Sequence, residues 1–263
     1  TFVSIMKKHK FHMISGVNTL YEALLNYDAF KELDFSNLLM SLSGGMAALD
    51  TTAKRWAEVT KSVIWQAYGL TETSPLVSVN DYKQTEFTGS VGLPAAYTEI
   101  EIRDESGNAL SETNAVGELC VRGPQVMSGY WKSEVSGLDE NNWFMTGDIA
   151  RIDETGNIFI VDRKKDMIIV SGFNVFPNEV EAVVNEHPAV LECGCVGVEG
   201  ENSQELVKVF IVLHDGQTAT EDEIISFCRE KLTAYKVPKH IEFIKEIPKT
   251  NVGKVLRREL KEN

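Results

Sequence analysis

The first 75 residues alternate between short apolar runs and amphipathic stretches. The runs of strand length are 12–17, 37–45 and 62–69. Helical spacing of apolar residues follows the first two runs. We expect Asn18 to cap the first helix, with Leu20 and Leu24 on its buried side, and Asp50 to begin the second. Strands that alternate with helices predict a parallel sheet, with ligands bound at the carboxyl ends of its strands.

From about residue 76 to residue 162 the pattern changes to short strands separated by Gly, Asn and Asp. The stretches "DESGN" (104–108) and "DETGN" (153–157) are typical of hairpin turns. We expect Asp148, in "WFMTGDIA", to stand at the end of another turn. This part of the chain is predicted to be an antiparallel, barrel-like section.

After "DRKKD" the pattern is that of a small α+β unit. A helix is predicted over 177–188, with an apolar face that runs to His187, and Thr220 and Glu223 form a capping box for a later helix. We place the boundary within 162–165, which gives domains of residues 1–162 and 163–263. The predicted fold class is therefore α/β, in which a parallel sheet and an antiparallel section precede a small α+β domain able to fold by itself.

Composition excludes several classes of protein. The chain has 263 residues, of which 43% are hydrophobic and 25% charged, as in soluble globular proteins. With 26 Lys and Arg against 39 Asp and Glu, the formal net charge is −13. That charge argues against nucleic-acid binding and against electrostatic docking on anionic lipid. No apolar run approaches the roughly 18–20 residues of a transmembrane segment.

Two further features concern the chain's origin. Its start, "TFVSIMKKHKFHM", lacks both an initiating Met and the layout of a signal peptide, so we expect a piece of a longer chain. The cysteines Cys120, Cys193, Cys195 and Cys228 indicate a reducing compartment. Cys193 and Cys195 share a face of one strand, but no further ligands at metal-binding spacing accompany them. We interpret all of these cysteines as plain thiols that fill space.

Two strands of the predicted sheet end in candidate binding stretches. "SLSGGMAAL" places Gly44 and Gly45 between a strand and a helix, where glycine lets backbone groups approach a ligand. The same pair also fits a tight turn without a ligand. In "YGLTETSPL", Tyr68 can stack on a base, Thr71 can bond a phosphate and Glu72 can hold Mg²⁺. A polar turn with a solvated carboxylate is the alternative.

Two more stretches contain candidate ligands near the domain boundary. Asp148 can accept two hydrogen bonds from a ribose diol, although a structural turn residue explains it equally. In "DRKKDMIIVSGFNVFPNEVE", Arg163 can bind ribose or phosphate, Lys165 stands where a rotation between domains would act, and Gly172 leaves room for a thin ligand. A solvated run of charges at a boundary is the other interpretation.

The C-terminal stretch "IPKTNVGKVLRREL" contains Lys254 beside Gly253 on a predicted loop. Gly-Lys ends a phosphate-binding loop, but Pro248 occupies the position of that loop's first glycine. A lysine there is suited to a phosphoryl group that gains charge in a transition state, and an ordinary surface lysine is the alternative.

In their order and spacing, "SGG", "YGLTE", "TGD", "DRKKDMIIVSGFNVFPNEVE" and "PKTNVGK" resemble the adenylate-forming superfamily of acyl-CoA synthetases, adenylation domains and luciferases. The resemblance covers essentially the whole chain. Within the superfamily, "GVNTLYEALLN", "GPQVMSGYW" and "LTAYKVPKHIEF" are most similar to the bacterial long-chain fatty-acyl-CoA synthetases. The resemblance implies an ATP- and Mg²⁺-dependent ligase that converts a fatty acid and coenzyme A into acyl-CoA, AMP and pyrophosphate.

The resemblance also implies roles for particular residues. Those implied to bind the nucleotide, the acid or coenzyme A are Gly44, Gly45, Tyr68, Gly69, Asp148, Arg163 and Gly172. Those implied to take part in catalysis are Thr71 at phosphate, Glu72 as the ligand of Mg²⁺, Lys165 as the hinge between the large domain and the C-terminal lid, and Lys254. Lys254 is implied to bridge carboxylate and α-phosphate oxygens in the first half-reaction. The implied location is the cytoplasm or the inner face of the membrane.

The chain departs from the family pattern in one important respect. The Ser/Thr/Gly-rich phosphate loop that precedes "YGLTE" in the family is absent, so we expect the fragment alone to be inactive. Two minor departures are Asn142, where the family has glycine, and a short loop over 132–142. The remaining alternatives are a ligase for a medium-chain or aryl acid and a non-catalytic, truncated binding protein of the same fold.

Overall fold

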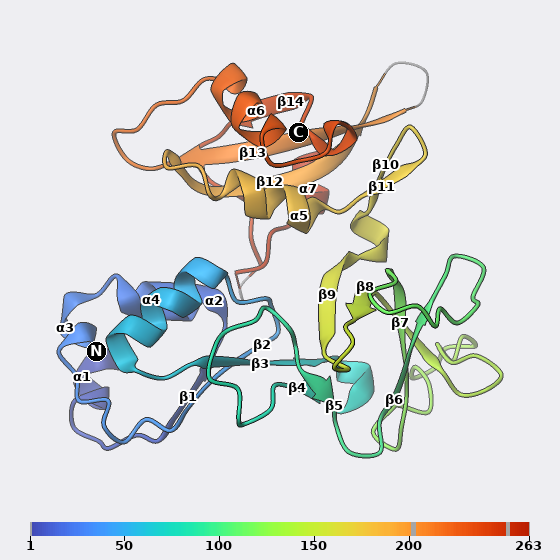
Figure 1. The fold of residues 1–263 in the computed structure, drawn as a ribbon, viewed down its shortest axis with the longest axis horizontal. Coiled ribbons are helices and arrows are strands. Elements are labelled where there is room, and N and C mark those ends of the chain that lie inside the picture. Colours follow the sequence, from blue (N-terminus) through green and yellow to red (C-terminus); the bar gives the residue numbers. More distant parts are fainter. Residues whose placement is uncertain (1, 201–203, 251–252, 263) are drawn as a thin grey trace. The chain divides into compact units, whose positions relative to one another are not determined.

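The structure, a computed structural model, describes residues 2–200, 204–250 and 253–262 (Figure 1). The chain forms two compact units, Thr1–Ile160 (unit 1) and Val161–Asn263 (unit 2). The division falls at Ile160, slightly before the predicted boundary at 162–165. The α/β fold class is confirmed. The assignment of the two units to the large domain and the lid stays a prediction.

Unit 1 is built on a sheet with the strand order β1-β2-β3-β4-β5. The strands are β1 Met13–Gly16, β2 Met40–Gly44, β3 Ile64–Gly69, β4 Leu76–Val79 and β5 Leu93–Pro94. As the alternating pattern predicted, β1, β2 and β3 run parallel. β4 and β5 add antiparallel strands. Neither was predicted as a strand, and β5, with two residues, is too short to show a period.

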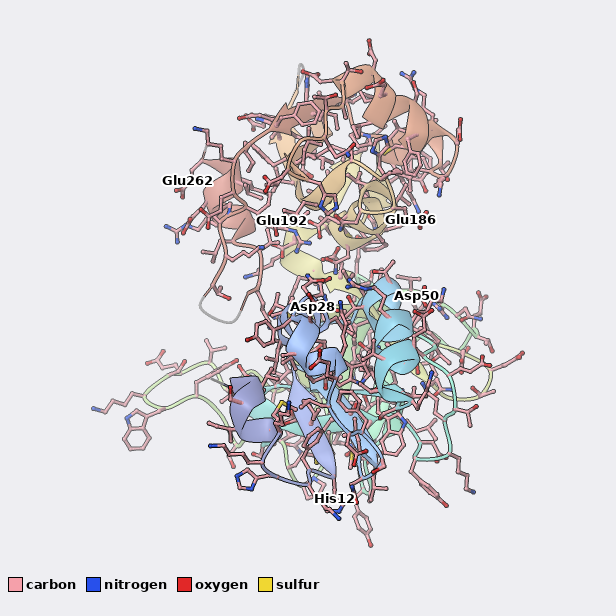
Figure 2. All side chains as sticks on the ribbon, turned by 90° about the vertical axis from the view of Figure 1, so that its left-hand side faces the viewer. His12, Asp28, Asp50, Glu186, Glu192 and Glu262 are labelled. Atoms are coloured by element: carbon pink, nitrogen blue, oxygen red, sulfur yellow. The ribbon has the colours of Figure 1, made fainter. Side chains whose placement is uncertain are left out.

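The helices of this unit are α1 Phe2–Met6, α2 Asn18–Leu25, α3 Asp28–Lys31 and α4 Asp50–Thr60. Their apolar sides enclose a core in which Tyr21, Phe30 and Trp56 are fully buried. The Trp56 indole donates a hydrogen bond to Ser41 Oγ on β2 at 2.9 Å, so this buried N–H is satisfied. Asp50 begins α4 as predicted, and Figure 2 shows it and Asp28 at the starts of their helices, where a negative charge complements the helix dipole.

The start of α2 differs from the prediction. Val17 is the N-cap, and Asn18 is the first helical residue rather than the cap. The Asn18 side chain is buried, and its Oδ1 accepts a hydrogen bond from the backbone N–H of Leu49 at 2.9 Å. Leu49 is in turn the N-cap of α4. The predicted cap therefore stabilises the start of the other helix, because a buried amide oxygen takes the donor that the tertiary fold brings to it.

A second sheet of unit 1 has the order β6-β7-β8-β9. Its strands are β6 Glu99–Arg103, β7 Gly117–Arg122, β8 Phe144–Ile152 and β9 Ile158–Arg163, of which β9 continues into unit 2. The pairs β6–β7 and β7–β8 are antiparallel, as predicted. Both predicted turns form, since the N–H of Asp104 bonds the carbonyl of Asn108 at 2.9 Å and the N–H of Asp153 bonds that of Asn157 at 3.0 Å.

Unit 2 consists of two small sheets and short helices. The elements are η2 Lys164–Asp166, β10 Ile168–Val170, β11 Phe173–Val175, α5 Pro177–Val184, β12 Val190–Glu199, β13 Glu205–Leu213, α6 Glu221–Arg229, η4 Ala234–Lys236, β14 His240–Phe243 and α7 Arg257–Lys261. β12 and β13 pair antiparallel, and β14 lies parallel to β13. The apolar faces of α5 and α6 contribute Val180, Val184 and Ile224 to one buried core with β12 and β13.

The helix predicted over 177–188 ends earlier, at Val184. The N–H of His187 bonds the carbonyl of Val184, which is the tighter spacing that closes a helix. Pro188 follows, and the residue before a proline disfavours the helical conformation. The predicted capping box of α6 is confirmed, with Thr220 Oγ1 accepting from Glu223 N at 3.2 Å and the Glu223 carboxylate accepting from Thr220 N at 2.7 Å.

All of the cysteines are buried thiols. Burial raises the pKa of Cys120 and of Cys228 from the ordinary value of 9.0 to about 11. Only the thiolate reacts, so we expect alkylation by iodoacetamide at pH 8 to be at least about 100-fold slower in the native protein than in denaturant. Mass spectrometry over time measures both rates. A cysteine that reacts equally fast in both would contradict the assignment of these side chains to the core.

The raised pKa values of Cys120 and Cys228 also make the stability of the folded state depend on pH. The folded state holds these protons more tightly than the unfolded state. The thiols therefore stabilise the fold below about pH 9, and this contribution is lost as the pH rises towards about 11.

Candidate active site

The parallel strands of unit 1 bring two predicted stretches together. Gly44, at the end of β2, is aligned with Ala67 on β3, so the stretch after Gly44 lies beside Tyr68. Gly45 has φ of +83°, a conformation that L side chains rarely adopt, and a Cβ there would have ample room. The backbone around Gly45 is exposed at the carboxyl edge of the sheet. This is the edge where ligands of parallel sheets bind.

Gly69 has a structural reason to be glycine. A Cβ at this position would lie 1.9 Å from the carbonyl oxygen of Pro75, which leaves no room for any side chain. The next residue, Leu70, donates its N–H to the same carbonyl at 2.9 Å. The close approach closes a loop that contains the short helix η1 Thr71–Thr73. Thr71 is exposed on this loop, and Glu72 is half-buried.

Asp148 is attached to this edge by a side-chain hydrogen bond. The Tyr68 hydroxyl donates to Asp148 Oδ2 at 2.5 Å, although the two residues are 80 positions apart. Asp148 is only 2% exposed. Tyr68 and Asp148, which were predicted separately as nucleotide ligands, are therefore in direct contact in the structure.

The prediction that Asp148 ends a turn is wrong, because Asp148 lies inside β8. The pairing of β7 with β8 shifts register across Met145 to Ile149, which is the signature of a β-bulge. Gly147 supplies the positive φ of +71°, and its N–H bonds Glu118 Oε1 at 3.1 Å. Bulges re-aim side chains, and the turn-like "TGD" pattern is the sequence of this bulge.

Sequence reasoning missed Tyr130, which contacts the predicted Mg²⁺ ligand. The Tyr130 hydroxyl donates to Glu72 Oε1 at 3.0 Å, and the Met127 N–H donates to the Glu72 carbonyl at 2.8 Å. The hydrogen bond to Glu72 raises the pKa of Tyr130. Tyr130 belongs to the family-like stretch "GPQVMSGYW", but only the fold shows that this loop reaches η1.

Unit 2 contains the other predicted residues. Arg163 ends β9, and its N–H bonds Asp162 Oδ1 at 2.7 Å. Lys165 is exposed in η2. Ser171 and Gly172 form the two-residue turn between β10 and β11, with φ of 51° and 83°. A positive φ at both positions is the geometry of a type I′ hairpin, so the turn alone already explains Gly172.

Lys254 belongs to a short antiparallel pairing of residues 248–250 with residues 253–256, which we call the Lys254 hairpin. Asn251 and Val252, part of the predicted "PKTNVGK" stretch, lie outside the described residues. Lys249 and Val255 form a bridge, and the Thr250 N–H bonds the carbonyl of Lys254 at 2.8 Å. Lys254 is exposed, and within residues 2–200, 204–250 and 253–262 its Nζ has no hydrogen-bond or ion-pair partner.

Arg257, an arginine that the sequence reasoning also missed, follows the Lys254 hairpin and is largely buried, with 13% of its side chain exposed. Arg257 begins α7, and its guanidinium donates to Glu181 on α5 with Nη2–Oε distances of 2.8 and 2.9 Å. It also donates to Asn178 Oδ1 at 2.7 Å and lies near the carboxylates of Asp166 and Asp162. Burial raises the pKa of Asp162, and the Arg257 charge opposes that shift. An arginine beside apolar residues in "GKVLRREL" was the available sequence signal.

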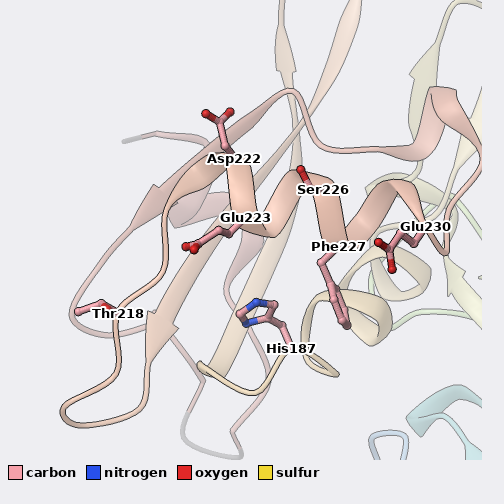
Figure 3. Close-up of a pocket in the computed structure, with 7 residues that line it drawn as sticks. All are labelled: His187, Thr218, Asp222, Glu223, Ser226, Phe227 and Glu230. Atoms are coloured by element: carbon pink, nitrogen blue, oxygen red, sulfur yellow. The ribbon is translucent and has the colours of Figure 1, made fainter.

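The structure also contains a pocket that none of the predicted nucleotide-binding or catalytic residues lines. It has a volume of about 510 Å³, opens widely to solvent beside α6, and is lined by His187, Thr218, Asp222, Glu223, Ser226, Phe227 and Glu230 (Figure 3). The His187 ring packs edge-on against Phe227 with centroids 5.1 Å apart. Its Nδ1 accepts the N–H of Ala189 at 3.3 Å. These contacts give His187 a structural role at the end of α5.

Residues 2–200, 204–250 and 253–262 lack two features that would indicate a metal centre or a membrane-spanning segment. Groups of three or more His, Cys, Asp or Glu arranged to hold a metal ion are absent from that part of the chain. The helices described there all lack the length and apolar character needed to cross a membrane.

Comparison with known proteins identifies the class. Residues 1–131 match the model of the AMP-binding enzymes, and residues 179–254 match that of the AMP-binding enzyme C-terminal domain. The chain belongs to the AMP-binding enzyme family.

Among curated proteins, the chain is similar to a long-chain-fatty-acid–CoA ligase of Escherichia coli O157:H7. The two are 51% identical over 99% of this chain and 46% of that protein. This chain therefore spans about half the length of the curated relatives it matches.

Among solved structures, the ATP-bound RpMatB-BxBclM chimera B1 matches with a TM-score of 0.91 and 30% identity, over 99% of this chain and 52% of that one. The anthranilate CoA ligase AuaEII, solved in complex with anthranoyl-AMP, matches with a TM-score of 0.86 and 30% identity, over 99% of this chain and 51% of that one.

Proposed function

We propose that this chain is the C-terminal part of an AMP-forming long-chain fatty-acid–CoA ligase. The observation that carries the proposal is the edge of unit 1, where Gly44 and Tyr68 lie at the ends of the adjacent parallel strands β2 and β3, Glu72 follows β3, and Tyr68 is bonded to the buried Asp148. The names of the similar proteins support the same chemistry. A long acyl chain also partitions into bilayers. We therefore propose that the enzyme works in the cytoplasm or at the inner face of the membrane.

In this proposal the nucleotide of ATP binds along the edge of unit 1. Tyr68 and the backbone at Gly44 and Gly45 line the adenine and acyl end, and Thr71 bonds a phosphate oxygen. Asp148 accepts hydrogen bonds from the ribose hydroxyls. Its Oδ2 is held by Tyr68, which fixes the direction in which the carboxylate points.

Glu72 fits the role of a Mg²⁺ ligand. Its carboxylate is half-exposed, and one oxygen is held by Tyr130. Mg²⁺ prefers hard oxygen ligands and binds through one or two carboxylates together with substrate phosphates. Bound with ATP, the ion would neutralise charge on the phosphate oxygens. A single well-oriented carboxylate is therefore a sufficient contribution from this part of the protein.

Two half-reactions follow. A carboxylate oxygen of the acid attacks the α-phosphorus, the bond from that phosphorus to the bridging oxygen breaks, and pyrophosphate leaves with its electron pair. Charge builds on the α-phosphate oxygens, where the Lys254 ammonium stabilises it. The thiolate of coenzyme A then attacks the acyl carbon, and AMP leaves.

The second half-reaction needs a different arrangement of unit 2 in this proposal. Lys165 is the hinge, Arg163 contacts the nucleotide, and Gly172 borders the channel of the pantetheine chain. Glycine is useful there because it has no side chain to obstruct a thin ligand, and a Cβ at Gly172 would meet nothing within 4 Å. Closing on ATP and then rotating excludes water from an adenylate that hydrolyses readily.

Sequence identity to the relatives favours a fatty acid over an aryl acid as the substrate. The chain is 51% identical to the fatty-acid ligase but 30% identical to the anthranilate ligase. The test is acid-dependent exchange of pyrophosphate into ATP, measured with the complete gene product on palmitate, octanoate and anthranilate. Each buried methylene contributes about 0.8 kcal/mol, so palmitate should exceed octanoate in kcat/KM by at least about 100-fold.

The other outcomes each support an alternative. Preference for octanoate or anthranilate would identify a ligase for a medium-chain or aryl acid. ATP binding without exchange on any acid would instead support a non-catalytic binding protein.

Replacing Tyr130 by phenylalanine tests the Mg²⁺ site. The change removes one hydroxyl and frees the Glu72 carboxylate. Loss of a group that orients a metal ligand typically weakens metal affinity about 10-fold or more. We expect the Mg²⁺ concentration for half-maximal ATP binding to rise about 10-fold, with ATP binding in the absence of Mg²⁺ unchanged, as measured by calorimetric titration. An unchanged Mg²⁺ dependence would show that Tyr130 does not orient a Mg²⁺ ligand.

A further inference from the structure

We propose that Arg257 is a positioning residue that fixes the Lys254 hairpin to the hinge segment, so that Lys254 moves as one body with the hinge. The hinge segment is residues 162–166. The inference rests on the proposed function for Lys254 and Lys165. It adds a residue that couples the two.

The Lys254 hairpin is held chiefly at its base. The Leu256 N–H bonds the carbonyl of Pro248 at 2.8 Å, and Arg257 is the next residue. Lys249, near the base of the hairpin, forms an ion pair with Glu192 on β12. Glu192 is labelled in Figure 2. Val255 packs beside the buried Ile247. The position of the exposed Lys254 therefore depends on how the base is oriented.

Arg257 determines that orientation through a largely buried pairing of its planar guanidinium with the Glu181 carboxylate. Its side chain is 13% exposed, as is that of Glu181, and both Glu181 oxygens accept from Arg257 Nη2. Glu181 Oε1 also accepts the N–H of Cys195 on β12 at 2.8 Å. The same guanidinium donates to Asn178 at 2.7 Å. One planar cation thus fixes the start of α7 against α5 and β12, which a flexible ammonium cannot reproduce.

Arg257 also contacts both ends of the hinge segment. Its Nη1 lies 3.4 Å from Asp166 Oδ2 and 3.9 Å from Asp162 Oδ1. Lys165 stands between these two aspartates. Asp162 Oδ2 additionally accepts the N–H of Asn178 at 2.7 Å, in the first turn of α5. Arg257 therefore contacts the hinge segment on both sides of Lys165, which makes this arginine the physical link between the hinge segment and the Lys254 hairpin.

The test replaces Arg257 by lysine in the complete gene product. The charge is kept, so Glu181 is not left as an unpaired buried carboxylate, but the planar guanidinium is lost. We expect pyrophosphate exchange to fall about 10- to 100-fold, the cost of misplacing a catalytic group by about 1 Å. Thioester formation from supplied acyl-adenylate should stay within about threefold. Arg258→Lys is the control, because Arg258 is 88% exposed and pairs only with Glu262 among the described residues.

A double variant separates positioning from general destabilisation. In the Lys254→Ala protein, the further change Arg257→Lys should alter the residual exchange by less than about twofold, since the group it positions is already gone. If the two losses multiply instead, Arg257 acts independently of Lys254 and the inference is wrong. Glu181→Gln, which keeps the acceptor for Cys195, should reproduce the Arg257→Lys pattern.

Amide hydrogen exchange decides the matter without any substrate. Arg257→Lys should speed exchange at Gly253, Val255 and Leu256 at least about 10-fold while β12 and β13 stay unchanged. Unchanged protection of these amides would overturn the inference. Amide hydrogen exchange does not need catalysis, so it tests the role of Arg257 separately from the proposed function. The proposed function is tested by pyrophosphate exchange, and it fails if the wild-type protein shows none.

Discussion

Replacing Lys254 by alanine should lower acid-dependent pyrophosphate exchange by at least about 100- to 1000-fold, the usual cost of removing a charge-stabilising donor from a transition state. In the proposed function, Lys254 is the cation that meets the charge building on the α-phosphate. Its exposed Nζ is not occupied by a structural partner among the described residues, so its loss should leave the fold intact. The measurement is incorporation of labelled pyrophosphate into ATP by the complete gene product.

The second half-reaction provides the internal control for Lys254→Ala. Thioester formation from supplied acyl-adenylate should stay within about threefold of wild type, because the reacting atom in that step is the acyl carbon rather than the α-phosphorus, and the proposed function gives unit 2 a different arrangement for it. Lys245→Ala is the matched lysine variant, since Lys245 is exposed and lies just before the hairpin. Equal loss of both half-reactions would show that Lys254 is not the adenylation lysine.

Replacing Lys165 by proline should affect mainly the second half-reaction, whereas Lys254→Ala affects mainly the first. We expect thioester formation to fall at least about 10-fold more than pyrophosphate exchange. Lys165 is the middle residue of η2, Lys164–Asp166. Proline fixes φ near −65° and restricts Lys164 as well, so the dihedral change that a rotation requires is blocked. Unit 2, once arranged for the first half-reaction, would then be unable to rotate into the arrangement that the second half-reaction needs.

Alanine at the same position separates rigidity from charge. Lys165→Ala removes the ammonium but leaves the backbone free, so it should retain thioester formation within about threefold. Separate assays of the two half-reactions, with acyl-adenylate supplied for the second, make the comparison. A second half-reaction that survives Lys165→Pro unchanged would remove the hinge assignment.

Local features of this protein were predicted well because their causes are local. The capping box of α6 needs only Thr220 and Glu223, three positions apart, and each hairpin turn needs only Asp, Gly and Asn in order. The failures have a common cause. Asn18 was predicted to be a helix cap, but its side chain binds the distant N–H of Leu49. Asp148 was predicted to be a turn residue, but it lies in a bulge opposite β7. His187 was predicted to be helical, but the proline that follows it disfavours a helix there.

The order of the glycine-rich, acidic and lysine-bearing stretches along the chain was enough to identify the adenylate-forming enzymes and the candidate residues. Which side chains contact one another, and what holds them in place, became visible with the three-dimensional fold. Tyr68 meets Asp148 across 80 positions, Tyr130 meets Glu72 across 58, and Arg257 meets Glu181 across 76. The physical reason is that side-chain bonds over such separations depend on strand register, bulges and helix packing, which neighbouring residues do not encode.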